Sequence, residues 1–187
     1  MNPGLRSPSR NRWFAVPVPR PAGADAGPPT QTWGATAKEM VNNGLRLAGI
    51  GPEITVKVPI TRIGIEAASD LTAESVATTM TGIHCPHQAF TAMAMGADYA
   101  APYLGRMNDA GRDGFGAIEA MLRMTTASES AMRILVASVR SVEDIERLAA
   151  VGGNTFAVPP AVGDQLFQDE LTLEAAAAFE DAVARTK

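Results

Sequence analysis

The stretch Ile54–Thr61 reads ITVKVPIT and sets one lysine among β-branched and apolar residues. β-Branched residues favour strands, and a short run that is apolar almost throughout is typical of a parallel strand covered on both faces. We therefore predict a buried strand over Ile54–Pro59, and the rest of the chain is interpreted outward from it.

Similar short runs recur along the chain, separated by alanine-rich segments with helical spacing. The other predicted strands are Ser75–Met80, Asp98–Ala101, Arg133–Ala137, Asn154–Ala157 and, more weakly, Gln31–Gly34. The predicted helices are Thr36–Leu47, Arg62–Leu71, Pro86–Met95, Gly114–Thr126, Val142–Val151, Pro160–Phe167 and Thr172 to about Thr186. Ser141 and Thr172 stand where helix N-caps are expected.

Strands and helices that alternate at this spacing indicate βαβ units and a parallel sheet. About six strands leave two α/β architectures open: a doubly wound sheet, or a (β/α)8 barrel of the TIM type that lacks two units. No GxGxxG or P-loop pattern follows a strand, which favours the barrel. The 187 residues also fall just short of the smallest complete barrels, which have about 200. We expect an incomplete barrel of about six βα units.

The first 29 residues differ from the rest, because they hold seven of the 13 prolines and four arginines without a periodic pattern. Proline removes a backbone donor and fixes φ, so this composition predicts an irregular segment. We accordingly expect residues 1–29 to be irregular and residues 30–187 to form the barrel domain with its C-terminal helix.

Charge and composition exclude several classes of function. A net charge of −4 provides no basic surface for a dedicated nucleic-acid binder. The single cysteine cannot form an internal disulfide, which fits a reducing compartment, so we expect a cytoplasmic protein. The apolar stretch from Trp13 to Val18 is too short for a signal peptide, and no stretch reaches about 18 apolar residues, so no membrane association is expected.

Lys57 is the unusual lysine of the three in the chain, because it lies inside the strand ITVKVP. Burying an ammonium costs several kcal/mol, and this cost favours the neutral amine. A neutral amine is a nucleophile that can form a Schiff base with a carbonyl. The alternative is a strand-edge lysine whose amine reaches water. Its position near the carboxyl end of the strand favours chemistry, because barrel enzymes place their active sites there.

Further polar residues follow two later strands. Tyr103 and Arg106 come after ADYAAP, and Ser138 and Arg140 come after ILVA. A hydroxyl near a lysine can relay protons, and two arginines on neighbouring loops can bind a phosphate ester. Surface arginines after strands are common, so neither arginine alone indicates a phosphate site. The interpretation rests on the placement of both.

The segment TGIHCPHQ offers His84, Cys85 and His87 as conceivable metal ligands. It supplies at most three ligands and its proline begins a helix, so we expect no metal site. Cys85 is interpreted as a small buried residue and His84 as a polar residue near the mouth of the site.

The segments TVKVPIT, TMTGIHCPHQ, GADYAAPYLGRM and LVASVR resemble the transaldolases, most closely the small fructose-6-phosphate aldolase branch. The resemblance runs from about Gln31 to the C-terminus with matching order and separations. It implies a (β/α)8 barrel in which Lys57 forms the Schiff base. It also implies that no metal or organic cofactor takes part.

The resemblance also assigns roles to other residues. Thr81 helps to position the catalytic water, Tyr103 transfers protons, and Arg106 and Arg140 bind phosphate with Ser138 beside them. Tyr103 and Gln31 stand where classical transaldolases carry phenylalanine and glutamate, so both point to the aldolase branch.

Two departures from the family pattern stand out. The family begins with two further βα units, which bring an aspartate and a threonine–asparagine pair, and Met1–Pro29 matches neither; Asp25 is not assigned to the aspartate. A truncated or frame-shifted coding region is one explanation. The second departure is Cys85–His87, where relatives carry small or apolar residues.

Two hypotheses follow. The first is a Schiff-base aldolase or transaldolase-like enzyme that reversibly cleaves fructose 6-phosphate into dihydroxyacetone and glyceraldehyde 3-phosphate. The second is an inactive, incomplete barrel that acts only as a partner subunit or is a decaying gene product, because open sheet edges pair with other chains. The apolar stripe of the C-terminal helix, and the family's use of that helix between subunits, predict a homo-oligomer.

Overall fold

The computed structural model describes residues 29–186. It contains one sheet of five parallel strands in the order β1-β2-β3-β4-β5. Their bounds are β1 Thr30–Gln31, β2 Val56–Pro59, β3 Thr78–Ile83, β4 Tyr99–Pro102 and β5 Arg133–Ile134. The irregular segment expected over residues 1–29 lies almost wholly outside the described residues and stays a prediction.

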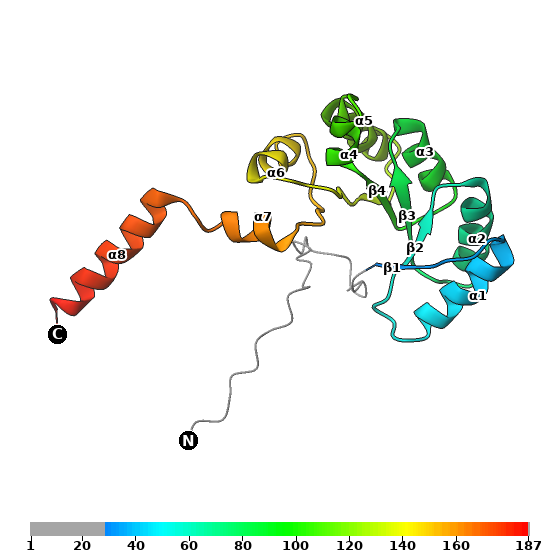
Figure 1. Cartoon of the computed structure of the whole chain (residues 1–187), viewed down its shortest axis with the longest axis horizontal. Coiled ribbons are helices and arrows are strands. Elements are labelled where there is room, and N and C mark those ends of the chain that lie inside the picture. Colours follow the sequence, from blue (N-terminus) through cyan, green and yellow to red (C-terminus); the bar gives the residue numbers. More distant parts are fainter. Residues whose placement is uncertain (1–28, 187) are drawn as a thin grey trace, which may run out of the picture.

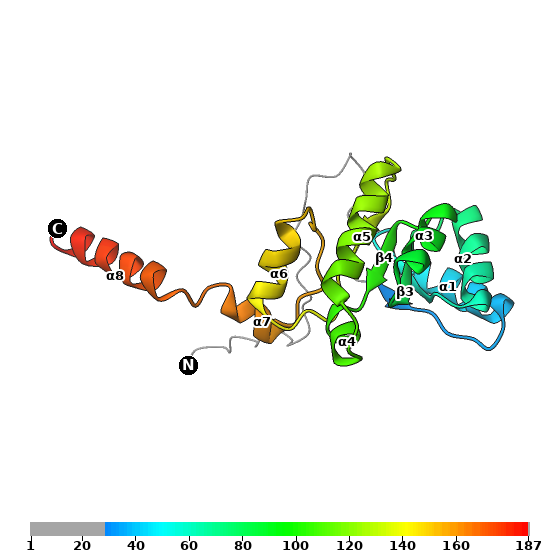
Figure 2. The ribbon, with the colours of Figure 1, turned by 90° about the horizontal axis from the view of Figure 1, so that it is seen from above.

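Helices alternate with the strands (Figure 1). They are α1 Ala37–Ala48, α2 Arg62–Ala73, α3 Pro86–Ala94, α4 Leu104–Asp109, α5 Gly114–Ala127, α6 Val142–Ala149, α7 Pro160–Gln165 and α8 Glu170–Ala184. Helices α1, α2, α3 and α5 form an arc along one side of the sheet, whereas α8 extends away from it in both views (Figures 1 and 2). The sheet and its helices have the arrangement of an incomplete (β/α)8 barrel, as the sequence predicted.

Strand β3 begins three residues later than predicted from the sequence, at Thr78 rather than Ser75. The cause is the end of α2, where Ser75 adopts a left-handed φ of 61° and the N–H of Val76 donates to the carbonyl of Leu71 at 3.0 Å. This hydrogen bond closes the helix in the manner of a Schellman motif. Pairing with β2 therefore starts only after the turn.

The predicted strand Asn154–Ala157 was wrong in extent. The chain there pairs with Val136 only through a bridge at Phe156, with hydrogen bonds from Val136 N to Thr155 O and from Ala157 N to Val136 O. Within residues 29–186 the sheet thus runs from β1 to this bridge, and these two borders do not pair with each other.

Of the two predicted helix N-caps, Ser141 is confirmed and Thr172 is wrong. Ser141 caps α6, as predicted, by accepting the N–H of Asp144 at 3.2 Å. Helix α8 instead starts earlier, because the carboxylate of Asp169 accepts both the N–H and the hydroxyl of Thr172 at 2.8 Å. These hydrogen bonds hold the pKa of Asp169 below its ordinary value.

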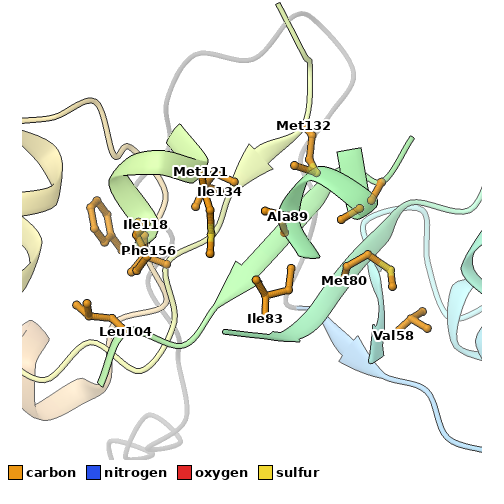
Figure 3. Close-up of a cluster of buried hydrophobic side chains, with 14 of the residues drawn as sticks. Val58, Met80, Ile83, Ala89, Leu104, Ile118, Met121, Met132, Ile134 and Phe156 are labelled. Atoms are coloured by element: carbon orange, nitrogen blue, oxygen red, sulfur yellow. The ribbon is translucent and has the colours of Figure 1, made fainter. Parts of the chain in front are cut away.

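The core lies between the sheet and the arc of helices. Val58 and Met80 are fully buried and belong to the same cluster as Met121 of α5 and Ile118 beside it (Figure 3). Residues alternate in direction along a strand, so the positions between these apolar residues face the other side of the sheet. Lys57 is one of these positions.

Strand β2 and helix α2 approach very closely at Gly64. A Cβ at this position would lie 1.9 Å from the carbonyl oxygen of Pro59, the last residue of β2. Gly64 is buried, so no open space can receive the added methyl group. The packing of α2 therefore requires glycine here.

We predict that Gly64→Ala destabilises the chain by about 1–3 kcal/mol, because overpacking forces the backbone of Pro59 and α2 apart. Its thermal midpoint should fall by about 2–4 °C for each kcal/mol. Gly163→Ala in α7 is the matched control, since a Cβ there would meet nothing within 4 Å. Equal midpoints for the two variants, measured by circular dichroism, would show that the close approach is not a constraint.

Candidate active site

Lys57 lies in the middle of β2, where it pairs with Gln31 of β1 and Thr79 of β3. Its side chain is half-buried, and its Nζ atom is 5.7 Å from the centroid of the Tyr103 ring. The amine therefore lies near the residue that follows β4.

Tyr103 is fixed to the neighbouring strand through its hydroxyl group. Its Oη atom is 2.7 Å from Oγ1 of Thr81, which is 4% exposed. The pairing of Thr81 with Ala101 brings the end of β3 beside the end of β4, so the two hydroxyls meet although they stand 22 positions apart. Two exchangeable hydroxyl protons thus lie together, and the ring that carries one of them is 5.7 Å from the Lys57 amine.

The short helix α4 was not predicted from the sequence, where its residues were interpreted as a loop. Leu104 and Met107 are buried on one side of it, and the N–H groups of Leu104 and Gly105 donate to the carbonyls of Ala137 and Ser138. These anchors hold α4 against the segment that follows β5. Arg106 is placed over the ring of Tyr103, with its Cζ atom 4.7 Å from the ring centroid.

The segment after β5 runs directly beside α4. Ser138 adopts a left-handed φ of 60°, and a Cβ at Gly105 would lie 2.4 Å from Nε of Arg140. Arg140 forms an ion pair with Asp109 at the end of α4, and both side chains are 56% exposed. The residues Ser138, Arg140 and Arg106 are therefore gathered around one short helix.

Gln31 touches the site through the backbone of Lys57. Its side-chain amide donates to the carbonyls of Thr32 at 2.9 Å and of Lys57 at 3.1 Å. Gln31 is exposed, and no hydrogen bond within the described residues joins it to Tyr103 or Thr81. These bonds place the Gln31 amide group beside the backbone of Lys57.

Two further polar residues near the site, Thr79 and Asp109, were not predicted from the sequence. Thr79 pairs with Lys57 and is fully buried, and its hydroxyl has no hydrogen-bond partner within the described residues. A polar residue two positions before Thr81 is the signal that could have identified it, because alternate residues share a face. No local pattern identifies Asp109, because its ion-pair partner Arg140 lies 31 positions further along the chain.

Residues His84, Cys85 and His87 do not converge. Nδ1 of His84 lies 2.9 Å from the carbonyl oxygen of Gly82, and Sγ of Cys85 accepts from Arg112 at 3.4 Å. His87 is exposed. Within residues 29–186 no group of three or more His, Cys, Asp or Glu side chains is placed to hold a metal ion. Cys85 is half-buried at the N-cap of α3, which corrects the expectation of a buried residue.

The fold and this site together define an α/β protein of the (β/α)8-barrel type, whose polar side chains gather where the parallel strands end. The chain belongs to the Transaldolase/Fructose-6-phosphate aldolase family, whose model matches residues 30–187. The family membership expected from the sequence motifs is thereby confirmed.

Two relatives illustrate the likeness. A probable transaldolase of Exiguobacterium sibiricum is 38% identical over 138 residues, which cover 74% of this chain and 64% of the relative. A probable transaldolase of a Caulobacter species is 37% identical over 147 residues, which cover 78% of this chain and 68% of the relative. The chain thus spans about two thirds of the length of these relatives.

Solved structures support the fold alone. The chain is similar to a mandelate oxidase, with a TM-score of 0.53 at 19% identity over 73% of this chain and 48% of the oxidase. It is also similar to a GMP reductase of Trypanosoma brucei, with a TM-score of 0.56 at 17% identity over 72% of this chain and 30% of the reductase.

The helices within residues 29–186 include none with the length and apolar character that a membrane span requires.

The hydrogen bond between Thr81 and Tyr103 can be measured with a double-mutant cycle. We expect Thr81→Val and Tyr103→Phe to show a coupling free energy of about 1 kcal/mol in urea unfolding, since each substitution removes one partner of the same bond. Thr125→Val on α5 is the control, because its hydroxyl donates within the helix to Leu122. If its coupling with Tyr103→Phe equals that of Thr81→Val, the bond contributes nothing specific.

Proposed function

We propose that this chain forms a Schiff base between Lys57 and a ketose phosphate, and that it reversibly cleaves fructose 6-phosphate into dihydroxyacetone and glyceraldehyde 3-phosphate. The observation that carries the proposal is the placement of the Lys57 amine 5.7 Å from the ring of Tyr103, whose hydroxyl is bonded to Thr81. Family membership supports the coarser statement of an aldolase-like protein acting on sugar phosphates.

The reaction follows from the nucleophilic amine. Nζ of Lys57 attacks the C2 carbonyl of the sugar, and loss of water from the resulting carbinolamine gives an iminium ion. Removal of the C4 hydroxyl proton breaks the C3–C4 bond, releases the aldehyde and moves the electron pair into the iminium as an enamine. Protonation at C3 and hydrolysis by water then release dihydroxyacetone and restore the lysine.

The proton transfers are assigned to the hydroxyl pair of Tyr103 and Thr81. Both atoms can donate and accept, so a water held on them can deliver a proton to the carbinolamine and later attack the iminium carbon. The side-chain N–H of Gln31 donates to the carbonyl of Lys57. The side-chain oxygen of Gln31 has no hydrogen bond within the described residues. We assign that oxygen to the same water.

Arg106 and Arg140 are assigned to the phosphate, with the Ser138 hydroxyl beside them. Guanidinium groups bind phosphate oxygens bidentately, and both arginines are exposed at the end of the sheet. Arg140 is now paired with Asp109, so a bound phosphate takes the place of that carboxylate. A dianion in contact with two guanidinium groups outcompetes a single exposed carboxylate, because exposed ion pairs are worth about 0–1 kcal/mol.

Borohydride trapping tests the proposed lysine. With fructose 6-phosphate present, reduction should leave a dihydroxyacetone adduct on the peptide that contains Lys57, and Lys57→Met should abolish the adduct. Lys38→Met is the matched control, because Lys38 is exposed on α1 and should keep full labelling. Mass spectrometry of the digested protein reads the result, and an unlabelled Lys57 peptide in the parent chain would refute the Schiff base.

Product analysis separates cleavage from transfer. We expect glyceraldehyde 3-phosphate to be released from fructose 6-phosphate without an added acceptor aldehyde, because Tyr103 and Gln31 both match the aldolase branch. Release only in the presence of an acceptor would assign the chain to transfer instead. Trapping on Lys57 without release of product in either assay would favour the second hypothesis, an inactive barrel whose open sheet edges serve a partner chain.

We also propose that α8 joins copies of this chain. Leu171, Phe179 and Val183 are separated by multiples of four residues, so they lie along one side of the helix, and they are 75%, 70% and 56% exposed. No residue of α8 is buried, and the helix extends from the body of the protein (Figure 2). An apolar stripe presented in this way fits a groove on a second copy.

Sedimentation velocity tests the role of α8. We expect the parent chain to sediment as an oligomer and the double variant Leu171→Glu, Phe179→Glu to sediment with a smaller mass, because two charges in an apolar interface are strongly unfavourable. Glu174→Gln, on the same helix, should leave the mass unchanged. A monomeric parent chain, or a double variant of unchanged mass, would contradict an interface built on α8.

A further inference from the structure

A β-bulge lies between Thr81 and Ile83, at the end of β3. Thr81 pairs with Ala101, but the next paired residue of β3 is Ile83, which lies opposite Pro102. The extra residue is Gly82, whose φ of +73° is in the left-handed region. Bulges of this kind turn the chain locally and redirect the side chains that follow, and they are frequent beside active sites.

The bulge orients the imidazole of His84. Nδ1 of His84 lies 2.9 Å from the carbonyl oxygen of Gly82, and a carbonyl can only accept, so Nδ1 carries the proton. The backbone N–H of His84 donates to Oε1 of Gln88 at 2.8 Å. Both the main chain and the side chain of His84 are therefore fixed.

The fixed imidazole packs edge-on against Tyr103. The two ring centroids are 5.6 Å apart and the rings are inclined by 86°. The Thr81 bond holds only the oxygen atom of Tyr103, and a phenol ring tied at its oxygen alone can still change its tilt. His84 supplies a contact from the same strand end as Thr81, and Arg106 covers the ring at 4.7 Å.

We propose that His84 is a positioning residue that holds the Tyr103 ring in the orientation required for proton transfer; this inference rests on the role of Tyr103 in the proposed function. The contact with Tyr103 matters because displacing a reacting group by about 1 Å can cost a factor of 10² in rate. The anchor on Gly82 matters because it sets the angle at which the imidazole meets the phenol.

Steady-state kinetics with fructose 6-phosphate test the proposal. We expect His84→Ala to lower kcat by about tenfold with little change in KM, because the substrate contacts remain while the proton-transfer group is loosened. His84→Phe should recover part of kcat, since it keeps an aromatic edge against Tyr103 but loses the anchor on Gly82, and His84→Asn should recover less, since it has a side-chain N–H but no ring. His87→Ala, at the exposed start of α3, is the control and should match the parent chain.

The Tyr103→Phe background separates positioning from general packing. Without the phenol hydroxyl, His84→Ala should cause no further loss of kcat, whereas a residue that only stabilises the fold lowers kcat equally in both backgrounds. Equal effects in the two backgrounds, or an unchanged kcat for His84→Ala, would overturn the proposal. Lys57 would still be labelled by borohydride in that case, so the proposed function would stand.

A second measurement needs no turnover. The chain has two tyrosines, so Tyr99→Phe leaves Tyr103 as the single source of tyrosine ring signals in an NMR spectrum. Adding His84→Ala should shift those signals and speed the flipping of the ring, whereas adding His87→Ala should change neither. Identical Tyr103 signals with and without the His84 imidazole would overturn the proposal, whatever the chain does to fructose 6-phosphate.

Discussion

Parallel pairing of β2, β3 and β4 is the constraint on which the site depends. In a parallel sheet the carboxyl ends of neighbouring strands meet at one edge. Strand pairing alone therefore brings together residues that are far apart in the sequence. Thr81 continues the register set by Lys57 and Thr79, and Tyr103 follows one strand further on. A one-residue slip in this register would turn the lysine toward the helices, since alternate residues face opposite sides.

Glycines allow the elements around the site to pack together in this register. Helix α2 returns against the end of the lysine strand because Gly64 has no Cβ to meet Pro59. Helix α4 lies against the segment after β5 because Gly105 leaves room for Ser138 and Arg140. Gly82 instead contributes a left-handed conformation, and the bulge that it forms brings the next polar side chain to Tyr103. Each glycine thus removes a steric or conformational barrier at a point where two elements must meet.

Much of this arrangement could be predicted from the sequence, and the rest depends on local geometry that the residue pattern does not encode. Lys57 was identifiable because a charge inside a β-branched run is costly, and Tyr103 because it follows a buried strand. Helix α4 was missed because its signal, six residues that contain a glycine, is weaker than the tertiary anchors that stabilise it. The start of β3 shifted for a similar reason, since a left-handed serine ends α2 where the apolar pattern alone suggests a strand.

Helix α4 lies between Tyr103, to which proton transfer is assigned, and the arginine proposed to bind phosphate, Arg140. It begins directly after Tyr103, carries Arg106 over the phenol ring and ends at Asp109, which pairs with Arg140. An anion that replaces Asp109 on Arg140 frees that carboxylate, and any shift of the six-residue helix toward the anion moves Arg106 relative to the ring. The anchors of α4 on Ala137 and Ser138 oppose such a shift, because they tie its first N–H groups to the chain after β5. If Arg140 exchanges Asp109 for a phosphate, as proposed, the same hydrogen bonds keep Arg106 over the phenol, so Tyr103 is not displaced.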